Sequence, residues 1–304
     1  MTTTAIENSF VTRHSEHRLP DEVEEALNRD HAARMAAVRR GHERVAAARL
    51  TAEDRRVLRG AESRVRADEA VRHALRDFTA RVRPELLGRF VPDLVDVDPA
   101  PRAADNMMWW ARTQWFPGGG IGIESLSDGL HYFGQRTYDG DNLIGFSVAS
   151  FATFELPRER RTPAARYRSL PYTEAFGEVT GWANLQVCPW ACDDKWCKCR
   201  LVLRQSAIQF VPGQGFKLCG ENITQTQIID RDGEGTGETF GLPGFQPMPP
   251  LEFALLAPNE TLIIDVEVRF DCQLEGSSMI TFSPNSTPAG SVVVRYPQWS
   301  VTPA

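Results

Sequence analysis

Four cysteines within twelve residues are the most concentrated chemical feature of the sequence: Cys188, Cys192, Cys197 and Cys199. Thiolates are common zinc ligands, and four of them can complete a tetrahedral structural site. Two disulfides, Cys188–Cys199 and Cys192–Cys197, would join the same residues in an oxidising compartment, and free thiols are the third alternative. In each case we expect a structural clamp rather than catalysis, because four thiolates leave zinc no open coordination position.

The segments on either side of the cysteines must bring them together. Residues 182–187 and 200–210 both alternate between apolar and polar side chains, as strands do. A hairpin of these segments would place the four sulfurs at its tip, with Cys197 and Cys199 on one face. Cys219 and Cys272 fall on other predicted strands; we interpret them as buried free cysteines, with an inter-sheet disulfide as the alternative.

An acidic loop is a second candidate metal site. Asp230, Asp232, Glu234 and Glu238 offer oxygen ligands, and the first three have the spacing that opens a calcium loop. Gly241 stands where a calcium loop of the EF-hand type has a bidentate glutamate, so the segment is not an EF-hand. A calcium site is one interpretation, and a solvated hairpin loop is the other and the one we prefer.

Aromatic side chains form the third group of candidates. Trp109, Trp110 and Trp115 precede a run of three glycines, and Trp190 and Trp196 lie among the cysteines. Flat rings beside flexible glycines suit the binding of a sugar or lipid. The alternative, which we prefer for the first three, is packing inside the fold. Trp190 and Trp196 would cover the clamp or form a contact surface.

Residues suited to catalysis are sparse after residue 100. Five of the six histidines come before residue 74, and only His131 comes later. A Ser-His-Asp group confined to the later part is therefore hard to build. Glu124 and Asp128 could act as paired carboxylates, and an enzyme would need both in one pocket with His131. His31 and His42 are eleven residues apart, about three helical turns, so they would share a helix face.

The scaffold that positions these residues changes along the chain. Residues 1–19 are polar and predict a flexible arm. Residues 20–90 predict an antiparallel helical hairpin, with helices that begin at about Asp21 and Thr51. Its thin apolar face must pack on the rest of the chain or on another copy. A proline-rich linker at 91–104 leads to residues 105–304, where apolar and polar side chains alternate at every second position, as they do in strands.

The pattern of residues 105–304 indicates a large antiparallel β-sandwich of the jelly-roll type, so the fold class is α+β. The candidate strands are 121–126, 130–135, 143–156, 179–187, 200–210, 224–229, 251–256, 261–272, 278–282 and 291–296. In the clearest, apolar residues from Leu262 to Phe270 alternate with Asp265, Glu267 and Asp271. We expect the charged face of this strand to meet water.

Composition limits the function. The net charge is −6, and the acid excess follows residue 83, so nucleic-acid binding is disfavoured. No apolar run is long enough for a transmembrane helix. The N-terminus lacks a secretory signal pattern, and we expect a cytoplasmic protein or one exported without a classical signal.

We interpret the chain as a non-enzymatic binding or assembly protein. Its sandwich would bind a protein or carbohydrate ligand, and its helices would dock it or pair it into a homo-oligomer. One alternative is an enzyme that acts on a carbohydrate or other small molecule in the concavity of the sandwich. Another is a toxin-like membrane-active protein, against which the charge around the helices counts.

Overall fold

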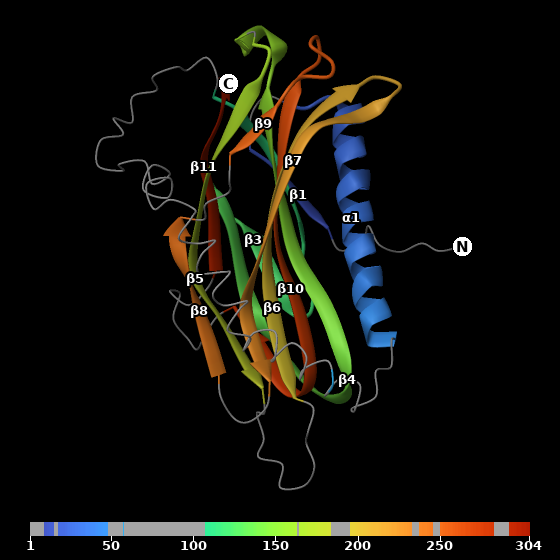
Figure 1. Ribbon diagram of the computed structural model, residues 1–304, viewed down its shortest axis with the longest axis vertical. Helices are drawn as coiled ribbons and strands as arrows, with labels where there is room; N and C mark the ends of the chain where they lie inside the picture. The colour runs from blue at the N-terminus through green and yellow to red at the C-terminus, as the bar shows by residue number, and fades with distance from the viewer. Residues whose placement is uncertain are drawn as a thin grey trace, which may run out of the picture. The chain divides into compact units, whose positions relative to one another are not determined.

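The computed structural model describes residues 9–14, 18–47, 57, 107–162, 164–183, 195–232, 237–245, 250–282 and 292–304. One long helix and eleven strands make up most of this part of the chain (Figure 1). In chain order the elements are β1 (Phe10–Arg13), α1 (Asp21–Ala47), β2 (Trp109–Phe116), β3 (Ile121–Ser125), β4 (Gly129–Leu156), the 3-10 turn η2 (Arg158–Arg160), β5 (Tyr167–Ala183), β6 (Trp196–Val211), β7 (Gly215–Asp232), β8 (Gly237–Phe245), β9 (Leu251–Phe253), β10 (Leu262–Thr281) and β11 (Val292–Pro303).

Two layers of antiparallel strands face each other. The first layer has the order β1-β2-β4-β10-β6-β7. The second contains β3, β11, β5, β8 and β9, together with the start of β4. The rings of Phe154 in β4 and Trp299 in β11 meet between the layers, 5.0 Å apart, and Ser169 of β5 donates to Gln205 of β6 at 3.0 Å. The predicted β-sandwich is confirmed at this level.

Strands β4 and β10 belong to both layers. The start of β4 pairs with β3 and β11, and its later part pairs with β2. β10 pairs with β4 over most of its length, with β6 through Leu262–Glu275, and with β5 at Ser278–Thr281. The sequence pattern predicts two separate strands in each case. That division is wrong because the glycine-rich segment of β4 around Gly140 pairs with Gly276 across a register shift, instead of turning back.

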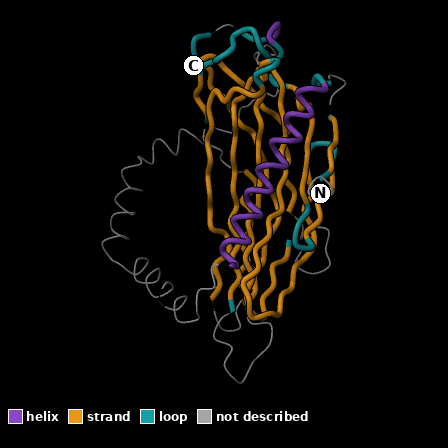
Figure 2. The backbone as a smooth tube through the Cα atoms, turned by 90° about the vertical axis from the view of Figure 1, so that its right-hand side faces the viewer, coloured by secondary structure: helices purple, strands orange, loops and turns teal. Residues whose placement is uncertain are grey.

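The two faces of β10 have different partners. Its apolar side chains, from Leu262 to Phe270, lie in the core between the layers, as predicted. The expectation that its charged side chains meet water is wrong: Asp265 and Glu267 are 1% exposed. Helix α1 lies obliquely across this face of the first layer (Figure 2), and it covers a polar surface that a strand pattern alone assigns to solvent.

Helix α1 begins at Asp21, as predicted, with three acids in its first turn that oppose the positive end of the helix dipole. Near its start, Val23 and Leu27 pack in a small apolar cluster with Leu19, Ala111, Ile208 and Ile263. Further along, the buried face is continued by the polar His31. No helix of the described residues has the length and apolar content needed to cross a membrane.

The predicted helical hairpin is not supported, because the structure describes one helix. Of the second predicted helix only Val57 is described, and the predicted linker at 91–104 lies outside the described residues. Contacts divide the chain into two compact units, Met1–Ala47 with Asp105–Ala304, and Ala48–Ala104. Helix α1 therefore belongs to the unit that contains the sandwich.

The segment predicted as a flexible arm contains strand β1. Its residues pair with β2 in antiparallel register, and Phe10 stacks on Trp115 with ring centroids 5.9 Å apart. The prediction is wrong for these residues because the open edge of β2 offers backbone hydrogen bonds to Phe10–Arg13, and Trp115 offers a ring for Phe10 to stack on.

Candidate functional site

A buried polar network between α1 and the first layer is centred on His31 and Asp265. His31 Nε2 lies 3.0 Å from Asp265 Oδ1, and Nδ1 lies 2.9 Å from Gln114 Oε1, which also accepts from Arg112 at 2.8 Å. The imidazole stacks on Phe151 with ring centroids 4.0 Å apart. Both ring nitrogens face acceptor oxygens, an arrangement that the doubly protonated ring satisfies. His31 and Asp265 therefore form a buried ion pair.

The charges around Asp265 decide what this cluster can bind. Burial on its own raises the pKa of Asp265, but the positive charges of His31, Arg34 and Arg112 lower it to about 2. Asp30, His31 and Asp265 offer ligand atoms within 4.8 Å of one another. A metal would need a neutral imidazole, and it would have to sit beside Arg34, whose Nη1 is 3.2 Å from Asp265 Oδ2. The cluster therefore fits helix docking better than metal binding.

A second polar group holds the later part of α1. His42 Nε2 lies 2.8 Å from Ser147 Oγ, and Ser147 donates to Asp271 Oδ1 at 2.7 Å. The residue types are those of a hydrolytic triad, but the carboxylate contacts the serine rather than the histidine. The serine proton is therefore directed at Asp271, and His42, whose pKa is lowered chiefly by burial, is not placed to remove it. This group fastens α1 to β4 and β10.

The sequence places His31 and His42 on one helix face, and both do face the first layer. The acids of the two polar groups, Asp265 beside His31 and Asp271 beside Ser147, could not be identified from local pattern, because their spacing predicts the solvent face of a strand. One signal was present in the sequence: every second residue from Asp265 to Asp271 is charged, namely Asp265, Glu267, Arg269 and Asp271. In the structure, Arg269 donates to Asp271 at 2.8 Å.

The outer face of the second layer, called the open face below, carries exposed aromatic rings. Phe133 is 41% exposed, Phe176 44% and Trp182 38%. These residues alternate along β4 and β5 with core residues, which shows that they point away from the first layer. The side chains assigned to the open face are Glu124, His131, Phe133, Glu174, Phe176, Glu178, Trp182, Val293 and Arg295.

Two of these rings lie over glycines of the neighbouring strand. Gly122 of β3 is opposite Phe133, and Gly237 of β8 is opposite Trp182. A Cβ atom added at Gly122 would come within 2.7 Å of the Phe133 ring, and one at Gly237 within 2.6 Å of the Trp182 ring, with several ring atoms in reach in both cases. Each ring therefore lies along the sheet in the space that a side chain would fill, with its other side toward solvent.

Phe176, the third exposed ring, lies in a row of side chains that crosses β4, β11 and β5. Val293 of β11 is opposite both His131 of β4 and Phe176 of β5. His131 Nδ1 lies 3.6 Å from Glu124 Oε2. Glu124 and His131, which an enzyme would need in one pocket with Asp128, are thus neighbours, but the Glu124 side chain is 67% exposed. These groups line an open surface rather than an enclosed acid-base site.

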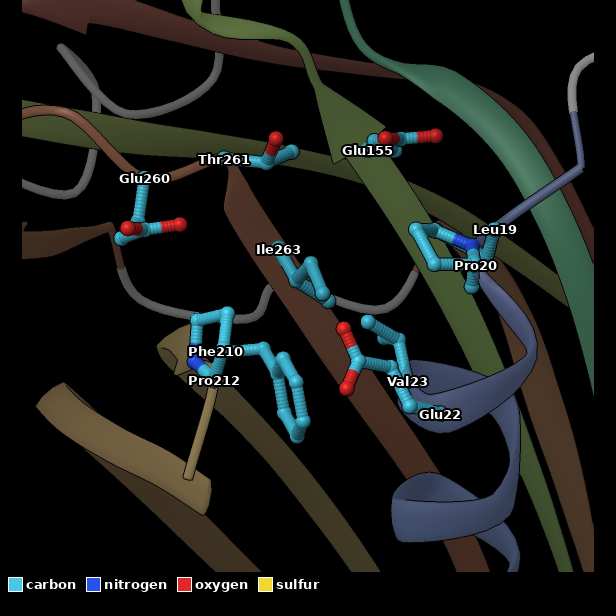
Figure 3. Close-up of a pocket in the computed structure, with 10 residues that line it drawn as sticks. All are labelled: Leu19, Pro20, Glu22, Val23, Glu155, Phe210, Pro212, Glu260, Thr261 and Ile263. Carbon is cyan, nitrogen blue, oxygen red and sulfur yellow. The ribbon is translucent and has the colours of Figure 1, made fainter. Parts of the chain in front are cut away.

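A small pocket lies beside the start of α1 (Figure 3). Its volume is about 120 Å³, below the roughly 300–1,000 Å³ of small-molecule sites. Figure 3 shows three carboxylates and an apolar floor among its lining residues, which are Leu19, Pro20, Glu22, Val23, Glu155, Phe210, Pro212, Glu260, Thr261 and Ile263. The pocket suits a few water molecules rather than an organic ligand.

Two of the four clustered cysteines are described. Cys197 and Cys199 lie on β6, buried in the core between the layers, so they share a face as predicted. Cys199 is opposite Cys272 of β10, and the two sulfurs are 3.6 Å apart. Cys219 and Cys272 are free cysteines. Cys188 and Cys192 lie outside the described residues, and the zinc or disulfide clamp stays a prediction.

The acidic loop predicted to bind calcium joins β7 to β8. Lys198 Nζ lies 3.5 Å from Asp230 Oδ1, and Arg231 Nε lies 3.2 Å from Glu238 Oε2. Basic side chains thus already neutralise two of the four acids. Glu234 and the side chain of Asp232 are outside the described part of the chain, so the calcium site also stays a prediction.

The tryptophans singled out in the sequence lie mostly against other groups of the fold. Trp110 stacks on His14 with ring centroids 3.7 Å apart, and Trp115 is buried. The Arg160 guanidinium lies 4.6 Å from the Trp109 ring centre, and Lys198 Nζ lies 3.9 Å from that of Trp196. Trp190 lies outside the described residues. The open-face rings, which the sequence does not single out, are better placed to meet a ligand.

No known protein family matches the sequence, and no curated protein matches it. Among solved structures, the chain is similar to TmCBM61 in complex with β-1,4-galactotriose, with 10% sequence identity and a TM-score of 0.21. The match covers 62% of this chain and 88% of that one. A TM-score of 0.21 is too low to indicate a shared fold, so this likeness carries no argument about ligand or function.

Proposed function

We propose that the protein is a non-enzymatic binding protein whose open face binds a carbohydrate chain. The observation that carries the proposal is the placement of Phe133 and Trp182, each lying over a glycine with one ring face toward solvent. A flat, exposed aromatic face is complementary to the apolar face of a sugar ring. Glycine beneath each ring keeps it along the sheet rather than upright.

The spacing of the rings favours a chain of several sugar units over a single one. Phe176 and the start of β4 are separated by β11, which puts two strand spacings, roughly 10 Å, between them. Trp182 is six residues further along β5, roughly 20 Å at the rise of a strand. Glu124, Glu174 and Glu178 can accept hydrogen bonds from sugar hydroxyls along this strip.

Binding is favoured over glycoside hydrolysis by the environment of the acids. Hydrolysis needs two opposed carboxyl groups, one of them kept protonated by its surroundings. Glu124 on the open face is largely exposed. The buried acids Asp265 and Asp271 are paired with basic groups under α1, on the other side of the molecule.

The test is binding to a panel of soluble galactans, glucans, xylans and mannans, followed by affinity electrophoresis and calorimetry on the full chain. We expect at least one polysaccharide to retard the protein. Phe133→Ala and Trp182→Ala should each weaken binding about fivefold, since stacking on one ring is worth about 1 kcal/mol.

Two further variants make the test specific to ring placement. Gly122→Ala keeps Phe133 but pushes its ring away, and it should weaken binding about as much as Phe133→Ala. Leu218→Ala removes an exposed apolar side chain from β7 of the first layer and should leave the affinity unchanged. The proposal fails if no polysaccharide binds, or if both aromatic variants bind like the unaltered protein.

A further inference from the structure

Cys199 and Cys272 are placed as a thiol pair across two adjacent strands of the first layer. They are directly opposite each other in the antiparallel register of β6 and β10, and both side chains are buried in the core between the layers. Their sulfur atoms are 3.6 Å apart. Opposite residues of an antiparallel pair have Cα atoms about 4.5–5.5 Å apart, within the range of about 4.4–6.8 Å that a disulfide requires.

The other described cysteines lack such a partner. Cys197 is opposite Leu274, and its thiol donates to the carbonyl of Met279 at 3.3 Å. Cys219 lies on β7 and donates to Gln209 Oε1 at 3.4 Å. Among the described thiols, therefore, Cys199 and Cys272 are the one pair whose sulfur atoms lie close enough for side-chain rotation to join them.

We propose that Cys199 and Cys272 form a cross-strand disulfide when the chain folds in the presence of a small-molecule disulfide such as oxidised glutathione. The thiolate of one cysteine attacks the glutathione disulfide, forms a mixed disulfide and releases one glutathione thiolate. The second cysteine then attacks the mixed disulfide and releases the other. Two protein thiols are oxidised by two electrons in total, one oxidised glutathione is reduced to two thiols, and the protons of the cysteines go to those thiols.

Folding and oxidation compete for these thiols. Burial raises the pKa of the Cys272 thiol in the folded chain, so the reactive thiolate is scarce there. The bond should therefore form quickly while the strands assemble, and only slowly once they are packed. The bond closes a loop between residues 73 positions apart, so it should constrain the unfolded chain and raise the melting temperature by roughly 5 to 10 °C.

The experiment refolds the full chain from denaturant, either with a reductant or with a mixture of oxidised and reduced glutathione, and then alkylates the remaining thiols. Trypsin is well suited to mapping the product. Cleavage after Lys198 and Arg200 separates Cys199 from Cys197, and Cys272 falls in the peptide 270–295. We expect non-reducing mass spectrometry to show Cys199 linked to that peptide, and the linked protein to melt at the higher temperature.

Variants and alternative products give the test its controls. Cys272→Ala should abolish both the linked peptide and the gain in melting temperature, whereas Cys219→Ala should abolish neither. The linked peptide in the unaltered chain is itself decisive if Cys272→Ala does not fold. Full alkylation of all six cysteines after oxidative refolding would overturn the proposal. So would a link from Cys199 to Cys188, or zinc retained with the four clustered thiols protected, since either result assigns Cys199 to the predicted clamp.

Discussion

His31 of α1 and Asp265 of β10 form an ion pair with no solvent-exposed side-chain surface, and Nε2 and Oδ1 are 3.0 Å apart. The pair lies under the middle of the helix, beyond the apolar cluster of Val23 and Leu27. It therefore fixes the position of a helix whose later turns have few large apolar side chains to bury. A buried pair of this kind specifies one arrangement more strongly than it adds stability.

Asp265→Ala should lower the free energy of unfolding by about 3 to 5 kcal/mol, because it leaves the buried charges of His31 and Arg34 without their carboxylate. Urea unfolding followed by tryptophan fluorescence measures the change. The matched control is Glu25→Ala, which removes an exposed pair with Arg29 on the same helix and should cost less than about 0.5 kcal/mol. Equal effects of the two substitutions would contradict the assignment of the buried pair.

Strand β1 should be held less firmly on β2 in mild acid. His14 stacks on Trp110, its Nε2 lies 2.9 Å from Thr113 Oγ1, and burial lowers its pKa to about 4 from 6.5. Between these values the unfolded chain binds a proton that the folded chain does not. The contribution of His14 is therefore complete above about pH 6.5 and is lost as the pH falls toward about 4.

Urea unfolding between pH 7.5 and pH 4, compared with His14→Phe, measures this contribution. Phenylalanine keeps a ring on Trp110 but cannot take up the proton, so the variant should lose less stability than the unaltered chain over this range. Parallel curves for the two proteins would show that His14 is not the group responsible.

Ser169→Ala should cost about 2 kcal/mol of unfolding free energy although it removes a single oxygen atom. Trp299 Nε1 donates to Ser169 Oγ at 2.9 Å, and Ser169 donates to Gln205 in the facing layer. Without the hydroxyl, the buried indole N–H loses this acceptor. Ser127→Ala, in the exposed turn between β3 and β4, should change stability by less than about 0.5 kcal/mol. Calorimetry of both variants checks the difference, which should disappear if the hydrogen-bond chain contributes nothing.

Features set by local pattern were predictable from the sequence. Helix α1 begins at the acidic turn at Asp21, and the apolar residues of β10 face the core, because both follow from periodicity and end effects. Strand β2 was not predicted, although it lies beside β4. Its polar Arg112 and Gln114 point toward α1, and a register shift after Trp110 breaks the alternation that would have marked a strand.

The candidate sites depend on contacts that no local pattern records. A charged strand face that meets water and one that meets a helix have the same alternating sequence pattern. The contact of Asp265 with His31, 234 residues away, could therefore not be predicted. The placement of Phe133 over Gly122 depends on strand register, which a sequence without turn geometry does not specify. The chemistry of single residues was thus recognisable, and their grouping was not.

Strands β4 and β10 run from one layer into the other without a break in the peptide chain. A ligand that makes the open face more rigid therefore also acts on β4 and β10, the two strands that contact α1. Within the unit that contains the sandwich, the helix and the aromatic rings therefore lie on opposite layers that share two continuous strands.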